Sequence, residues 1–103
     1  MKHDPIEVIQ ETLTQEERLA QLAEEATELA HAALKLRRAY GGTNPTPVPA
    51  KKAYEGLLEE IADVSNCLVV LGYDGSLAKV RTSLLMTEKL HRWANRLEEV
   101  GKQ

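Results

Sequence analysis

The amino-acid sequence predicts an all-α protein: a helical bundle of three main helices per chain that is completed by oligomerisation. Of its 103 residues, 28% are charged and only 4% are aromatic, which is typical of helical bundles. Apolar residues recur at three- and four-residue spacings in three stretches, and segments rich in Gly and Pro separate these stretches. A chain of this length has a thin core, so we expect another copy to cover part of its surface.

The first main helix is predicted to begin at Thr14 and to open a single helical domain over residues 14–103. Residues 1–13 before it form an arm or a short helix. Thr14 and Glu17 have the spacing of a capping box, in which each side chain accepts a hydrogen bond from the other residue's amide. The helix ends at Gly41-Gly42. Its apolar positions are Leu19, Leu22, Ala26, Leu29, Ala33 and Leu36.

The second and third main helices follow two turn-forming segments. GGTNPTPVP at 41–49 is predicted to be an ordered connection, because its prolines exclude helix and restrict the backbone. The second helix spans about 50–71 and ends at Gly72, and the third runs from an N-cap at Ser76 to about Glu99, with a break near Thr82 or Thr87 left open. The expected buried face of the second helix is Tyr54, Leu57, Ile61, Val64, Leu68 and Leu71.

Charge and composition exclude several classes of function. A net charge of −3 and the absence of a basic stripe argue against binding to duplex nucleic acid. The single cysteine, Cys67, has no partner for an intramolecular disulfide, and we expect it to be a small buried side chain. The first ten residues lack the apolar core of a signal peptide, and no apolar run is long enough to cross a membrane. We therefore expect a cytoplasmic protein without a membrane partner.

Four carboxylates are the candidate functional residues. At about 100° per residue, Glu25 and Glu28 fall on one flank of the first helix's apolar face, whereas Glu24 points away. Glu60 and Asp63 likewise share one flank of the second helix. If the two flanks meet, the carboxylates converge and need a counter-charge, for which Mg²⁺ is suited. The alternative is that they are ordinary glutamates on a solvated helix surface.

The same residues carry a resemblance to a known family. EEATE at 24–28 and EIAD at 60–63 resemble the E-E-x-x-E and E-x-x-D signature of the MazG-like all-α nucleoside triphosphate pyrophosphohydrolases. The resemblance covers roughly residues 19–96. In addition, ALKLRRA at 33–39 and NPTPV at 44–48 are similar to the short members of the family that phages and prophages carry.

The resemblance implies a homo-dimer or homo-tetramer that binds Mg²⁺, or Mn²⁺ in its place, through Glu25, Glu28, Glu60 and Asp63. Such enzymes cleave a nucleotide between its α and β phosphates and release the monophosphate and pyrophosphate. The chemistry agrees with the residues, because Mg²⁺ neutralises a polyphosphate and lowers the pKa of an attacking water. One carboxylate can instead orient that water as a base, and the sequence does not assign which one.

Basic residues on two helices remain open to more than one interpretation. The resemblance implies phosphate contacts by Lys89 and Arg96 on the last helix, with ordinary surface charge as the alternative. Trp93 occupies the spacing at which the family has an Asn, and we expect it to pack in the core, with base stacking second. Lys35, Arg37 and Arg38 complement the dipole at the end of the first helix, with a phosphate or subunit contact as the alternative.

Three further functions compete with this one. A phosphoribosyl-ATP pyrophosphatase has similar length and chemistry, and a non-catalytic helical module would instead bind a partner protein through its apolar stripes. Glu28 with His31 and Glu88 with His91 have the E-x-x-H spacing of di-iron bundles. The helical wheel opposes this last interpretation, because neither imidazole points inward with its glutamate.

Overall fold

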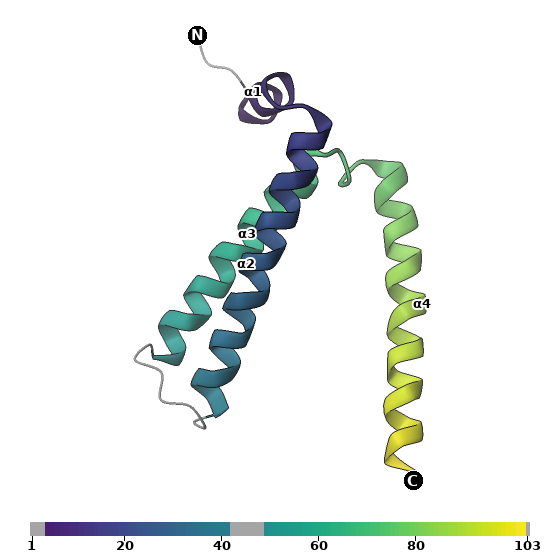
Figure 1. The fold of residues 1–103 in the computed structure, drawn as a ribbon. Helices are drawn as coiled ribbons and strands as arrows, with labels where there is room; N and C mark the ends of the chain where they lie inside the picture. Colours follow the sequence, from purple (N-terminus) through teal and green to yellow (C-terminus); the bar gives the residue numbers. More distant parts are fainter. Residues whose placement is uncertain (1–3, 42–48, 103) are drawn as a thin grey trace. The chain divides into compact units, whose positions relative to one another are not determined.

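The computed structural model describes residues 4–41 and 49–102, and every regular element in these ranges is a helix (Figure 1). The helices are α1 (Pro5–Thr12), α2 (Gln15–Gly41), α3 (Ala50–Val70) and α4 (Ser76–Gly101). The all-α prediction is confirmed. The chain divides into two compact units, Met1–Leu71 and Gly72–Gln103. Most of the predicted GGTNPTPVP connection lies outside the described residues.

Local capping interactions begin the first two helices. The Asp4 side chain accepts a hydrogen bond from the Ile6 amide at 3.0 Å, and Pro5 occupies the first turn of α1. At the start of α2, the Thr14 amide donates to Glu17 Oε1 at 2.9 Å and the Glu17 amide donates to Thr14 Oγ1 at 3.1 Å. Hydrogen bonding of the Glu17 carboxylate to the Thr14 amide, and then to the Thr14 side chain, lowers the pKa of Glu17. The predicted capping box is therefore confirmed.

Helices α2 and α3 lie side by side and form the body of the first unit (Figure 1). Their less exposed residues recur at alternating spacings of three and four, which is the pattern of a coiled-coil seam. On α2 the seam residues are Arg18, Leu22, Glu25, Leu29, Ala32, Leu36 and Ala39. On α3 they are Ala53, Leu57, Glu60, Val64 and Cys67, and Leu71, the C-cap residue that follows the helix, continues the spacing.

The seam on α3 differs in part from the predicted buried face. Leu57, Val64 and Leu71 lie in it as expected, but Tyr54, Ile61 and Leu68 are 47%, 44% and 37% exposed. The physical reason is that α3 is apolar on two adjacent flanks, so the wheel centred on Ile61 was rotated from the flank that meets α2. The other flank stays open within this unit, and its large apolar residues are Tyr54, Leu58, Ile61 and Leu68.

The carbonyl of Val70 joins three helices at the end of α3. Gln10 Nε2 from α1 and Arg18 Nη1 from α2 both donate to it, at 3.2 Å and 2.6 Å. They satisfy an acceptor that the end of α3 would otherwise leave without a partner. The helix then ends before Gly72, whose φ of 79° is the left-handed conformation that glycine adopts without strain.

Helix α4 forms the second unit by itself. The predicted N-cap, Ser76, is the first residue of the helix, and Gly75 is the N-cap. The helix is continuous through Thr82 and Thr87, whose hydroxyls donate to the carbonyls of Ala78 and Ser83 in the preceding turns. None of the residues of α4 is buried within its unit, and Trp93 is 58% exposed, so the predicted core packing of Trp93 does not occur there. Among the described helices, none is long and apolar enough to cross a membrane.

Candidate metal centre

Three of the four predicted carboxylates meet on the α2–α3 pair. One oxygen each of Glu25, Glu60 and Asp63 lies within 4.8 Å of the other two. Glu25 and Glu60 are partly buried because both occupy seam positions, whereas Asp63 is exposed on the adjoining flank of α3. The register of the two helices, which places Glu25 opposite Glu60, therefore builds the cluster.

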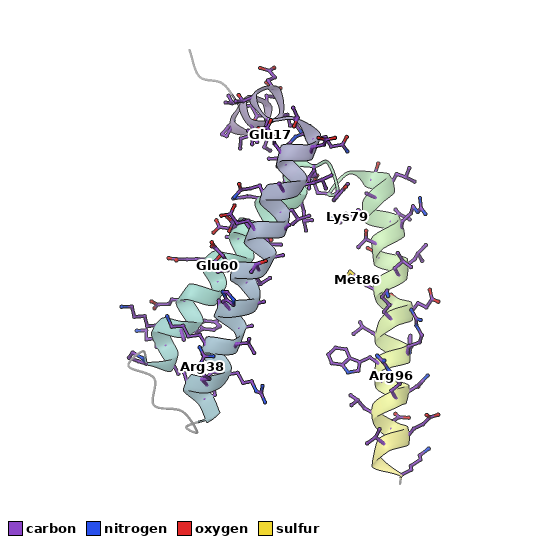
Figure 2. The ribbon with its side chains drawn as sticks, in the orientation of Figure 1. Glu17, Arg38, Glu60, Lys79, Met86 and Arg96 are labelled. Carbon is purple, nitrogen blue, oxygen red and sulfur yellow. The ribbon has the colours of Figure 1, made fainter. Side chains whose placement is uncertain are left out.

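Glu28 lies beside this group rather than within it. It is exposed, one turn after Glu25 on α2, and it shares the lining of a groove with Glu60. Its charge also reaches Glu60, because Glu28 is among the groups that raise the Glu60 pKa. The structure thus places all four predicted carboxylates on one side of the helix pair, in the region where Figure 2 labels Glu60.

Two carboxylate oxygens in the cluster lack a hydrogen-bond partner among the described residues. Gln21 Nε2 donates to Glu25 Oε1 at 2.9 Å, but Glu25 Oε2 and Glu60 Oε2 are buried and accept no hydrogen bond. An acceptor shielded from water without a hydrogen bond is unfavourable, and more so when it is charged. A proton or a cation between these oxygens would remove that cost.

The charges around Glu60 also favour a bound proton or cation. Burial raises its pKa most, and the carboxylates of Glu28, Asp63, Glu25 and Glu59 raise it further. All of these contributions disfavour the charged form of Glu60. A bound proton or cation would therefore relieve the repulsion among the carboxylates.

The donor set fits a hard divalent cation. Mg²⁺ binds oxygen ligands at about 2.0–2.1 Å, so two oxygens on opposite sides of it lie about 4.2 Å apart. At most one pair of three octahedral ligands is opposite, and the other pairs lie about 2.9 Å apart. The oxygens of Glu25, Glu60 and Asp63 lie within 4.8 Å of one another, so these side chains would have to draw together to share one ion. Three carboxylates without nitrogen or sulfur donors suit Mg²⁺ and Mn²⁺ better than softer metals.

Hollows adjoin the carboxylates on both sides along the helix pair. The larger, of about 720 Å³, is here named the basic groove, and its charged lining is Glu28, Glu60, Lys35, Arg38 and Lys52. The smaller, of about 250 Å³, is lined by apolar residues of α1 and α3 and by the polar side chains of Arg18, Gln21, Glu25, Asp63 and Asn66. The sequence prediction missed Lys52 and this layout, although Lys35 and Lys52 each lie about two helical turns from a predicted carboxylate.

Lys89 and Arg96 belong to the second unit. They lie on α4 and line one hollow of about 540 Å³ together with Trp93, Arg92, Asn95 and Glu99. The exposed indole and the two cations therefore share one face of the helix. Phosphate contacts by Lys89 and Arg96 remain a prediction.

Cys67 is a buried free thiol in the seam, as predicted. Burial raises its pKa most, and the charges of Glu25 and Asp63 raise it further. A raised pKa keeps the sulfur protonated and unreactive at neutral pH. Cys67 is therefore a packing residue next to the carboxylates.

No family model, curated protein or solved structure matches this chain. The fold and the site together define an all-α protein with a carboxylate cluster between two packed helices.

Proposed function

We propose that this protein is a Mg²⁺-dependent nucleotide pyrophosphohydrolase of the MazG-like type. The observation that carries the proposal is the cluster of Glu25, Glu60 and Asp63 in and beside a helix seam, with two buried oxygens that have no hydrogen-bond partner. Purely apolar residues at these seam positions would pack without an electrostatic cost. Carboxylates there are accounted for by a ligand that needs them.

The four carboxylates would bind the metal from different sides, according to their exposure. Glu25 and Glu60 would hold Mg²⁺ from the seam, and Asp63 and Glu28 would hold it from the solvent side. When bound, Mg²⁺ neutralises a polyphosphate, polarises the α-phosphorus and lowers the pKa of a bound water. An exposed carboxylate of the set can accept the proton of the attacking water, because only exposed groups contact water on the groove side.

An assembly of identical subunits is part of the proposal. On α3, Asp63 and Ile61 lie about 160° apart around the helix axis, so the open apolar flank faces away from the carboxylates. Another copy can therefore cover Tyr54, Ile61 and Leu68, which are 47%, 44% and 37% exposed, without closing the site. Within the second unit, α4 also carries exposed apolar residues, including Leu84, Leu90 and Leu97. We propose a homo-dimer or homo-tetramer, testable by light scattering coupled to size-exclusion chromatography.

The decisive experiment measures the products of hydrolysis. Purified protein is incubated with Mg²⁺ or Mn²⁺ and a panel of NTPs, dNTPs and phosphoribosyl-ATP, and pyrophosphate and monophosphate are both quantified. We expect equal amounts of the two products, at least a hundredfold less of each in Glu60→Gln, and no change in Glu24→Gln. Glu24 is a matched control, because it is an exposed glutamate of α2 outside the cluster. Pyrophosphate release that Glu60→Gln leaves unchanged contradicts the site.

The panel also separates the competing functions. Turnover of phosphoribosyl-ATP alone identifies the second enzyme class. A non-catalytic interaction module is favoured by the many exposed apolar side chains of α3 and α4. It predicts no hydrolysis of any nucleotide and no effect of Mg²⁺ on thermal unfolding.

A further inference from the structure

We propose that the basic groove binds the pyrophosphate portion of the substrate, with Lys35, Arg38 and Lys52 as its phosphate ligands. This inference rests on the proposed function, which supplies a polyphosphate as the substrate. It assigns the phosphate contacts to the α2–α3 pair itself. The sequence prediction placed them first at Lys89 and Arg96, with a phosphate contact near the end of the first main helix as an alternative.

The groove places cations and carboxylates along one continuous surface. Lys35 follows Glu28 on α2 by two turns, about 10 Å along the axis, and Lys52 precedes Glu60 on α3 by about 12 Å. The two helices run in opposite directions, so their cations gather at the same end. Figure 2 labels Arg38 and Glu60 at different levels of the pair. A chain of phosphates with Mg²⁺ at the carboxylates can therefore extend toward these cations.

The floor of the groove leaves room for such a ligand. It consists of Ala32, Ala53 and Gly56, which have small side chains or none. A Cβ added to Gly56 would meet no atom within 4 Å, so the space above this glycine is open. The cavity of about 720 Å³ is within the range of sites for small molecules and cofactors.

The helix dipole accounts for Arg38, the cation in the last turn of α2, but not for the cation on α3. Lys52 lies in the first turn of α3, which contains no acidic residue, and a cation there opposes the helix dipole. Lys35 and Arg38 are three residues apart on α2, a spacing at which like charges repel. A bound anion relieves both effects. Three cations on two helices also match the several oxygens of a pyrophosphate group better than a single charge does.

Binding of inorganic pyrophosphate in the presence of Mg²⁺, measured by titration calorimetry on the full chain, tests this inference. We expect Lys52→Gln and Arg38→Gln each to raise the Kd about tenfold or more, as expected when a hydrogen bond to a charged group is lost. Lys52→Arg should restore most of the affinity. The matched controls are Lys51→Gln and Arg37→Gln, which remove neighbouring charges that do not line the groove. We expect the Kd of each control to stay within twofold of the wild-type value.

The Mg²⁺ affinity without pyrophosphate separates this inference from the proposed function. We expect it to be unchanged in Lys52→Gln and lost in Glu60→Gln. If nucleotides are hydrolysed but the groove variants bind pyrophosphate as tightly as wild type, the inference is wrong and the function stands. If the groove variants lose pyrophosphate binding in a protein that hydrolyses no nucleotide, the groove is an anion site and the proposed function is wrong. Equal losses in the groove variants and in the controls overturn the inference, since net charge alone then explains them.

Discussion

Replacing Glu60 with Gln should change the stability of the protein in opposite directions with and without Mg²⁺. The substitution keeps the size of the side chain and removes one negative charge. In the metal-free protein, burial and then the carboxylates of Glu28, Asp63 and Glu25 raise the pKa of Glu60, so its charged form is disfavoured. A neutral amide avoids this repulsion. We therefore expect metal-free Glu60→Gln to have a higher Tm than wild type at pH 7.

The pH dependence gives this effect a sign that can be measured. A carboxyl whose pKa is raised on folding binds more protons in the folded state than in the unfolded state. Its stabilising contribution is complete below its ordinary value of 4.5 and is lost as the pH rises through the raised pKa. The Tm curves of wild type and variant should therefore meet at low pH and separate as the pH rises, with the variant above.

Mg²⁺ should reverse the order. The cluster has three carboxylates, and the variant keeps two of them, so its metal affinity falls. At a Mg²⁺ concentration ten times its Kd, binding stabilises the wild type by RT ln 11, about 1.4 kcal/mol. For a chain of about 100 residues this corresponds to roughly 6–11 °C in Tm. The variant should gain close to none of it. Since protons compete with the metal, the wild-type gain should also shrink as the pH falls through the raised pKa of Glu60.

The assay is thermal unfolding followed by circular dichroism at several pH values, in EDTA and in Mg²⁺. Glu24→Gln is the matched control, and it should follow the wild type under every condition. Two results would refute the reasoning. One is a metal-free Glu60→Gln protein that is less stable than wild type at pH 7, and the other is an equal rise in Tm with Mg²⁺ in both proteins.

Three further predictions concern the helix ends, the glycines and the thiol. Thr14→Ala should cost about 1 kcal/mol in chemical unfolding by removing the hydroxyl that accepts a hydrogen bond from the Glu17 amide. The stability lost on acidification should also be smaller in this variant. Because the pKa of Glu17 is lowered on folding, its stabilising contribution is present above 4.5 and is lost as the pH falls below that value. Equal losses of stability in acid in variant and wild type would contradict this. Gly56→Ala should stabilise by about 0.5–1 kcal/mol, because the position is helical and open, whereas Gly72→Ala should destabilise by about 1–2 kcal/mol at its φ of 79°. Effects of the same sign at the two glycines would refute that reading. Cys67 should react with a thiol reagent far more slowly in the native protein than in urea, and rapid native labelling at pH 7 would show that the seam opens.

Helix boundaries were predictable because they depend on contacts within a few residues. Thr14 and Glu17 specify the start of α2 through their own two hydrogen bonds, and Gly72 specifies the end of α3 through its backbone conformation. The buried flank of α3 was less predictable, because Leu57 and Ile61 are equally apolar and only the partner helix distinguishes them. The wheel consequently placed Glu25 and Glu60 beside the apolar face, whereas the structure places them within the seam.

The basic groove depends on information that no single helix contains. Lys35 and Lys52 become neighbours of one cavity only through the register between α2 and α3. Helical periodicity describes directions around one axis, so it carries no information about which turn of a second helix lies opposite. The carboxylates were easier to find, because their spacing on each helix already placed them on one flank.

The seam positions of Glu25 and Glu60 link the stability of the helix pair to metal binding. Seam positions of a helix pair are most stable when they are apolar, and replacing buried charge with packed hydrophobic residues is often neutral or stabilising. Glu25 and Glu60 therefore weaken the metal-free pair, and a cation bound between them turns that weakness into a link between the helices. The same ion that prepares a phosphate for hydrolysis would then also stabilise the helix pair, so folding and substrate binding would depend on one set of oxygens.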